Sequence, residues 1–71
     1  MNYTVKMEGV HDAYYCHHFD SETEARKYAR KLKTLKGYES GRRVANAIVI
    51  YKWADNDSTM TEIHRIDLKA I

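Results

Sequence analysis

The chain has 71 residues, with 12 Lys or Arg against 10 Asp or Glu, for a net charge of +2. This length predicts a single domain, residues 1–71, that buries only about 60% of the surface of its unfolded chain. The single cysteine excludes an internal disulfide and fits a reducing compartment. No apolar run reaches the roughly 18 residues of a membrane span, and the N-terminal stretch lacks a signal peptide's apolar core. We therefore expect a cytoplasmic protein that does not bind membranes.

Two strands are expected first. Residues 3–8 alternate apolar and polar side chains, which predicts a half-buried strand. Gly9 and Asp12 favour a turn, and residues 13–19 then complete a hairpin. The second strand has Ala13, Tyr15, His17 and Phe19 on one face and Tyr14, Cys16 and His18 on the other. Both faces are partly apolar, so the pattern leaves open which one is buried.

Residues 21–36 predict a helix. Ser21 and Glu24 have the capping-box spacing, in which the serine hydroxyl accepts a hydrogen bond from the Glu24 N–H. Gly37 suits the left-handed position that follows a helix end. Apolar residues recur at spacings of three and four, at Ala25, Tyr28, Ala29, Leu32 and Leu35. They form a stripe that we expect to pack on the sheet.

A polar loop and a central strand are expected next. Residues 39–43 read as a short loop in which Gly41 is free to take a positive φ. Residues 44–54 are the most apolar run of the chain. Their β-branched and aromatic side chains predict a strand at the centre of the sheet.

The last element expected is a fourth strand at residues 59–68, after a hairpin loop at residues 55–58. Ile63 is out of phase with the other apolar residues of this strand, Met60, Ile66 and Leu68. A break of phase is typical of a β-bulge or of an edge strand.

The element order is ββαββ, which predicts an α+β domain with one helix packed on a four-stranded, mainly antiparallel sheet. The strand order 2-1-3-4 is the expected topology. The second face of the sheet would stay partly open, lined by some of the Tyr and His residues.

The stretch FDSETEARKYARKL at residues 19–32 resembles the strand-to-helix junction of small uncharacterised ββαββ domains of bacteria and their phages. In size and in its lack of catalytic motifs, the chain also resembles phage accessory proteins that inhibit host machinery, such as anti-CRISPR proteins. The junction resemblance implies the fold. The second resemblance implies an inhibitor or modulator that docks on a host protein complex.

Catalytic and metal motifs are missing from the sequence. Cys16, His17 and His18 are good zinc ligands by type, but no C-x₂-C or H-x₃-H pair accompanies them. Asp55 and Asp57 begin like an EF-hand loop that then lacks its Gly and Glu. No phosphate-binding loop, dinucleotide fingerprint or nucleophile elbow is present. We expect no enzyme activity, no cofactor and no metal.

Basic charge is concentrated in one part of the chain. The window from Arg26 to Arg43 holds eight of the 12 basic residues and one of the 10 acidic ones, so it carries +7 and the remainder −5. Such a window attracts acidic partners, although a merely solvated face is the alternative interpretation. The expected partner-binding residues are Arg26, Lys27, Arg30, Lys33, Lys36, Arg42 and Arg43. Of these, Arg30, Lys33, Arg42 and Arg43 should carry the binding, and we expect that the core needs none of these four. A second candidate surface is the open sheet face with Tyr14, Tyr15 and Trp53.

Three functions fit this layout. The first is a non-enzymatic, stoichiometric binding protein that docks its basic surface on an acidic macromolecule, namely a host protein complex. The second is a direct nucleic-acid or nucleotide binder, in which exposed tyrosines stack on bases. The third is a self-associating structural module, a homodimer formed through a sheet edge.

Overall fold

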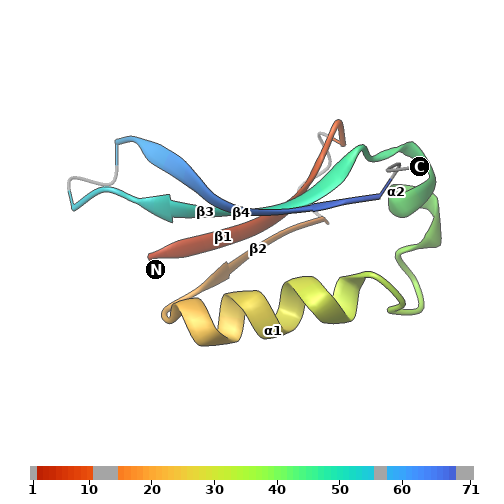
Figure 1. Cartoon of the computed structure of the whole chain (residues 1–71), viewed down its shortest axis with the longest axis horizontal. Helices are drawn as coiled ribbons and strands as arrows, with labels where there is room; N and C mark the ends of the chain where they lie inside the picture. The colour runs from red at the N-terminus through yellow and green to blue at the C-terminus, as the bar shows by residue number, and fades with distance from the viewer. Residues whose placement is uncertain (1, 11–14, 56–57, 69–71) are drawn as a thin grey trace.

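A computed structural model describes residues 2–10, 15–55 and 58–68. Its elements are β1 (Tyr3–Glu8), β2 (Cys16–Phe19), α1 (Glu22–Leu32), α2 (Glu39–Val44), β3 (Ala47–Trp53) and β4 (Met60–Asp67). The strands form one antiparallel sheet in the order β2-β1-β3-β4, and α1 runs along one face of it (Figure 1). The predicted α+β class, the ββαββ order and the strand order are confirmed.

The core lies between α1 and the sheet. In the register of the central strands, Val5 of β1 is opposite Ile50 of β3, and Met7 is opposite Ile48, so all four side chains project to the helix side. The fully buried cluster consists of Val5, Met7, Ala25, Ala29, Leu32, Ala45, Ile48 and Ile50. Burying each larger member stabilises the fold by about 1.5–3 kcal/mol. The small alanines of α1 let the helix approach the sheet closely.

Aromatic rings close the β2 side of the core. The His17 ring lies 4.9 Å from that of Tyr28 and the Phe19 ring 5.2 Å from it, between centroids. The Tyr28 hydroxyl donates to that of Tyr38 over 3.3 Å, and the Tyr38 hydroxyl lies 3.2 Å from Nε2 of His17. Tyr15 packs edge-on against Tyr38. The β2 face that the sequence left undecided is therefore the one with Tyr15, His17 and Phe19.

The helix α1 begins as predicted but ends earlier. The Ser21 hydroxyl accepts a hydrogen bond of 3.2 Å from the Glu24 N–H, which confirms the predicted cap. The helix stops at Leu32 instead of residue 36. The guanidinium of Arg42 donates hydrogen bonds to the carbonyl oxygens of Leu32 and Leu35, over 2.9 and 2.7 Å. These carbonyls then have no need of the N–H groups of a further helical turn. Gly37 does take the predicted left-handed conformation, with φ of 93°.

The predicted loop at residues 39–43 is wrong, because this segment belongs to α2. Gly41 does not have the expected positive φ either; it is buried instead. A Cβ atom at Gly41 would lie 2.6 Å from Cε1 of Tyr15 and 2.9 Å from Sδ of Met7. Glycine is therefore present for space, since it lets α2 approach the end of the sheet (Figure 1).

The ends of the last two strands also differ from the prediction. β3 begins at Ala47, since Val44 ends α2 and is exposed. In β4, His64 is opposite Ile50 and Glu62 is opposite Tyr51, which leaves Ile63 unpaired. The predicted bulge is thus confirmed, and β4 is also an edge strand. Of the predicted second strand, residues 13–14 lie outside the described residues and Tyr15 precedes β2.

We predict that Gly41→Ala lowers the free energy of unfolding. Alanine is favoured over glycine in a helix by about 1 kcal/mol, but overpacking a full site costs about 1–3 kcal/mol. A net loss of about 1 kcal/mol is expected in urea unfolding. Ser40→Ala, at the exposed neighbouring position of α2, is the control and should change stability by no more than about 0.5 kcal/mol. A Gly41→Ala variant as stable as the parent would contradict the assigned packing.

A second prediction concerns Arg42. Arg42→Met keeps an apolar stem but removes both hydrogen bonds, one to the Leu32 carbonyl at the end of α1 and one to the Leu35 carbonyl in the connection that follows. Hydrogen bonds to charged groups contribute about 1.5–3 kcal/mol, so a loss in this range is expected in urea unfolding. Arg43→Met, on the next and exposed residue, should be nearly neutral. Equal stability of the two variants would show that the Arg42 bonds do not hold α1 to α2.

Candidate basic interface on α1

Two of the predicted partner-binding arginines have bonds within the fold. Nε of Arg26 donates to a carboxylate oxygen of Glu22, one turn earlier in α1, over 2.7 Å. Arg42 bridges α2 and the end of α1, so the expectation that the fold does not need it is wrong. Its half-buried guanidinium neutralises the partial negative charge of the helix C-terminus.

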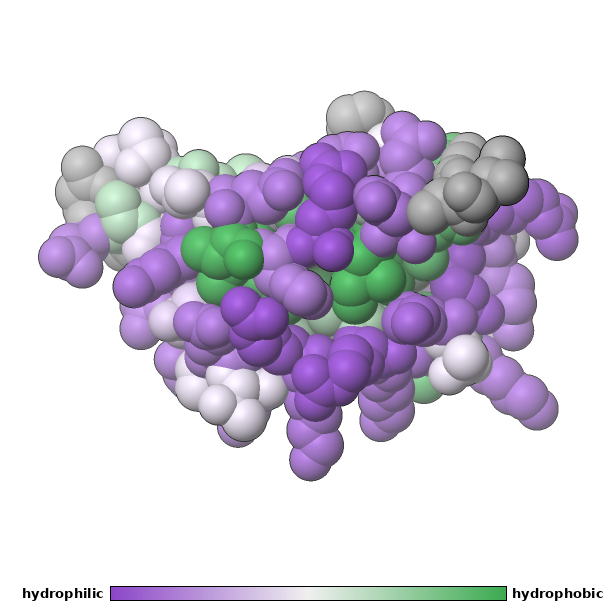
Figure 2. Space-filling model, in the orientation of Figure 1, coloured by the Kyte–Doolittle hydropathy of each residue, from purple (hydrophilic) through white to green (hydrophobic). Residues whose placement is uncertain are grey.

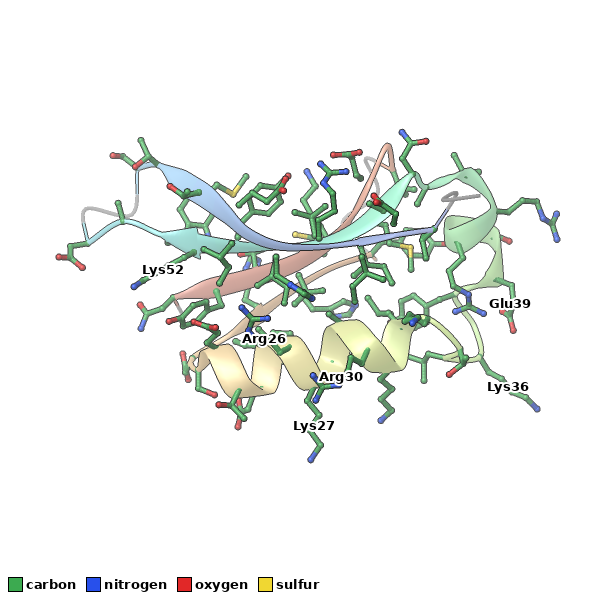
Figure 3. All side chains as sticks on the ribbon, in the orientation of Figure 1. Arg26, Lys27, Arg30, Lys36, Glu39 and Lys52 are labelled. Carbon is green, nitrogen blue, oxygen red and sulfur yellow. The ribbon has the colours of Figure 1, made fainter. Side chains whose placement is uncertain are left out.

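The remaining cations of α1 lie on two different flanks. Ala25, Ala29 and Leu32 mark the buried line of the helix, and Tyr28 lies on the flank toward β2, where it meets Phe19. At 100° per residue the opposite flank faces β4, and we call it the β4 flank. It carries Arg26 and Arg30, and Lys33, the C-cap residue directly after Leu32, continues it. Lys27 and Lys31 project away from the sheet, and we call them the outer flank; Figure 3 shows Lys27 pointing away from the sheet and Arg26 toward it.

Lys36 and Arg43 form a third group at the other end of the molecule. Lys36 lies in the connection between α1 and α2, and Arg43 lies on α2. Figure 3 shows Lys36 far from Lys27. The Glu39 carboxylate accepts a hydrogen bond of 2.9 Å from the Gly37 N–H, and bonds to its own and that backbone N–H lower its pKa. The seven predicted residues therefore do not form one continuous patch.

A shallow groove lies beside the outer flank. It is lined by Phe19, Glu24, Lys27, Tyr28 and Lys31. The Phe19 and Tyr28 rings are tilted by 45° to each other, and the two lysines are one helical turn apart. Lys31 was not among the predicted site residues, although its spacing of four from Lys27 was a usable signal. An aromatic wall beside paired cations can accept a flat, anionic group such as a nucleotide.

The second candidate surface keeps only one of its three residues. Trp53 lies on the helix-free face, where its indole N–H donates to Oγ1 of Thr4 over 2.7 Å. Tyr15 was placed there wrongly, since its ring packs on the helix side against Tyr38. Tyr14 lies outside the described residues. Oγ1 of Thr4 also lies 2.8 Å from Nδ1 of His18, which ties β1, β2 and β3 together on this face.

Charged side chains on the helix-free face neutralise one another. Arg65 of β4 makes a bidentate contact with the Glu8 carboxylate of β1 and a further one with Glu62 at 3.1 Å. The hydrogen bond from Arg65 lowers the pKa of Glu8, and the same pair raises the pKa of Arg65. Lys6 lies over the ring of Tyr51, 5.9 Å from its centroid. This face therefore presents less unpaired charge than α1.

Within residues 2–10, 15–55 and 58–68, no three His, Cys, Asp or Glu side chains are grouped so that they could hold a metal ion. Cys16 is a half-buried free thiol. None of the described helices is long and apolar enough to cross a membrane.

Comparison of the chain with protein-family models, with curated proteins and with solved structures finds no match.

The Glu8–Arg65 pair predicts a pH dependence of stability. Because the pKa of Glu8 is lower in the folded than in the unfolded chain, the pair stabilises the fold above the ordinary glutamate range, roughly pH 4, and this contribution is lost as the pH falls through the folded pKa. At neutral pH, Glu8→Gln should have a lower free energy of unfolding than the parent. On acidification the parent should lose more of this free energy than Glu8→Gln does. Urea midpoints measured across this pH range test it. Parallel curves for the two proteins would contradict the assignment.

Proposed function

We propose that this chain is a non-enzymatic binding protein that acts stoichiometrically and docks its α1 surface on an acidic partner. The observation that carries the proposal is the contrast among its cations. Arg26, Arg42 and Arg65 are bonded to groups of the fold. Lys27, Arg30 and Lys31 of α1 and its C-cap residue Lys33 are exposed and, among the described residues, have no carboxylate within ion-pair distance.

The partner we favour is a protein complex of a host cell, which this chain would inhibit or modulate. Two points support it. The resemblance to small phage accessory proteins suggests such a role, and the free cations occupy more than one flank of the helix, as suits a broad protein surface. Charge of this kind raises the rate of association more than it raises the affinity.

A second candidate function is direct binding of nucleic acid. The groove between Phe19, Tyr28 and the outer flank favours it, since the rings can stack on a base while Lys27 and Lys31 reach phosphates. Binding of this kind would weaken linearly with salt on a log–log scale, with a slope of roughly 0.7 per phosphate contact for a single strand.

The test compares two charge-reversed proteins with the parent. One is Arg30→Glu with Lys33→Glu, and the other is Lys27→Glu with Lys31→Glu; Arg42 is left intact because the fold uses it. Each chain is immobilised and exposed to a nuclease-treated bacterial lysate. The parent should retain acidic proteins, and at least one variant should retain at least tenfold less of them. Both variants should unfold at the same urea concentration as the parent. Retention of the same proteins by all three chains would leave α1 as a solvated surface.

Random single-stranded DNA and RNA, followed by fluorescence anisotropy at low and moderate salt, separate the two candidates. The protein-binding proposal predicts no saturable binding at moderate salt. Tight binding that the Lys27→Glu, Lys31→Glu variant loses would instead support the nucleic-acid function.

A further inference from the structure

The helix-facing side of β4 is only partly covered. The packing of α1 is mainly against β1, β2 and β3. Ile63 and Ile66 of β4 lie at the margin of the core cluster and stay half-exposed. Figure 2 shows hydrophobic surface between β4 and α1, framed by hydrophilic side chains. We call this strip, with Ile63 and Ile66 as its floor and the β4 flank of α1 as its wall, the β4 groove.

The bulge of β4 contributes to this groove. Ile66 is opposite Ile48, whose side chain is in the core, so Ile66 projects to the helix side. In a regular strand, residue 63 would face the other side, because side chains alternate. The extra residue at the bulge resets this phase and brings Ile63 to the core margin as well.

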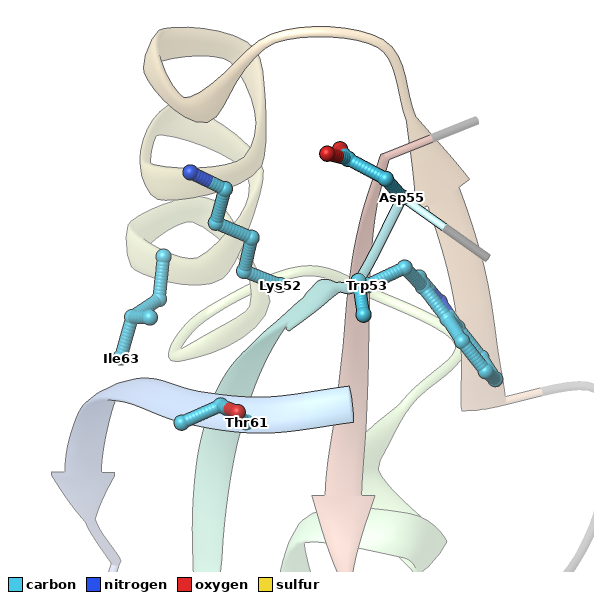
Figure 4. A pocket seen from close by; sticks show the side chains of 6 residues that line it. Lys52, Trp53, Asp55, Thr61 and Ile63 are labelled. Carbon is cyan, nitrogen blue, oxygen red and sulfur yellow. The ribbon is translucent and has the colours of Figure 1, made fainter. Parts of the chain in front are cut away.

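A hollow continues the groove toward the β3–β4 hairpin (Figure 4). Ile63 and Thr61 of β4 line it, together with Lys52, Trp53, Ala54 and Asp55. Figure 4 shows the side chains of Lys52 and Asp55 projecting toward the helix layer. The hollow therefore has an apolar part at Ile63 and one charge of each sign.

The backbone of β4 offers a row of hydrogen-bonding groups beside the groove. Within the described sheet, β4 pairs with β3 on one side and has no strand on the other. It has eight residues, whereas β2 at the opposite edge has four. An extended peptide can pair with such an edge, and its alternate side chains then enter the neighbouring groove.

The charges around the groove indicate that its ligand is acidic. The wall and the hollow carry four cations, Arg26, Arg30, Lys33 and Lys52, and two carboxylates, Glu22 and Asp55. Because Glu22 is bonded to Arg26, the excess positive charge lies mainly at Arg30 and Lys33. An occupant with carboxylates beside its apolar side chains complements this arrangement.

A second copy of the chain fits the groove poorly. Antiparallel pairing of two β4 edges would place both α1 helices on the same face of a continuous sheet, with their β4 flanks turned toward each other. Arg30 and Lys33 of the two copies would then approach across the seam, and like charges oppose association. The bulge at Ile63 also opposes pairing between two long, regular edges.

We propose that the β4 groove binds an extended acidic segment of a partner protein, which adds as a fifth strand along β4. Its apolar side chains contact Ile63 and Ile66, and its carboxylates reach Arg30 and Lys33. The inference rests on the proposed protein-binding function and specifies the chemistry of the segment that the partner presents.

The test uses a synthetic peptide as long as β4, which has eight residues. Its odd positions are threonine, and its even positions, which share one face of a strand, are glutamate, glutamate, valine and valine, so that the two carboxylates are neighbours on that face, as Arg30 and Lys33 are on the helix. Titration into the isotope-labelled chain should give saturable amide shifts in β4 and in the β4 flank. Replacing both glutamates by glutamine should raise the apparent Kd at least tenfold. The protein variant that combines Arg30→Glu with Lys33→Glu should raise it by at least the same factor.

Two matched controls separate pairing from charge attraction alone. Lys36→Glu with Arg43→Glu makes the same charge change at the other end of the molecule and should leave the Kd within about twofold, because neither residue lies on the β4 flank. Methylating alternate backbone nitrogens of the peptide removes donors while keeping its charge. Two such peptides exist, methylated at the odd or at the even nitrogens. The peptide whose methylated nitrogens face β4 should not shift the β4 amides, because it has lost the donors that pair with the strand.

Several results would overturn the inference: no saturation at millimolar peptide, equal binding of the glutamine peptide, or shifts confined to the Phe19–Tyr28 groove. Shifts of β4 that depend on protein concentration without peptide would assign the edge to a second copy. If the peptide fails while lysate proteins still depend on the basic flanks, the binding function stands and only the β4 groove is refuted. If both tests fail, the proposed function fails with it.

Discussion

One helix is too narrow to cover four strands, and much of this structure follows from that mismatch. Strands lie about 4.8 Å apart, so the axes of a four-stranded sheet span roughly 14 Å, whereas a helix is about 10 Å across. The chain covers the β2 side with the rings of Tyr28 and Tyr38 and closes one end of the core with α2. The helix packs mainly on β1, β2 and β3, so Ile63 and Ile66 of β4 stay half-exposed.

The sequence predicts the fold where a local signal and the tertiary structure agree. The strand at residues 3–8, the cap at Ser21 and the phase break at Ile63 are each visible in a few neighbouring residues, and each is confirmed. It fails where distant residues decide. The end of α1 depends on Arg42, ten residues beyond Leu32, and six residues of α2 are too few to show a helical period. The burial of Gly41 depends on the ring of Tyr15, which lies just before β2. No residue near Gly41 in the sequence indicates this contact.

The candidate interface could be predicted as a charged segment but not as a shape. The run of Lys and Arg in residues 26–43 is plain in the sequence, yet it does not show that Arg42 is bonded within the fold or that Lys36 lies at the far end of the molecule. Dividing the helix into flanks requires knowing that Tyr28 faces β2. Ile63 and Ile66 read as ordinary strand residues until the position of α1 over the other three strands is known.

The hydrogen bond from Trp53 to Thr4 has a spectroscopic consequence. Trp53 is the only tryptophan of the chain, and its indole joins β3 to β1 on the face opposite α1. Its fluorescence emission therefore senses the pairing of the two central strands, whereas ring contacts at Tyr28 and Tyr38 sense the seating of the helix. The emission of this one indole therefore reports on the pairing of the central strands without any attached dye.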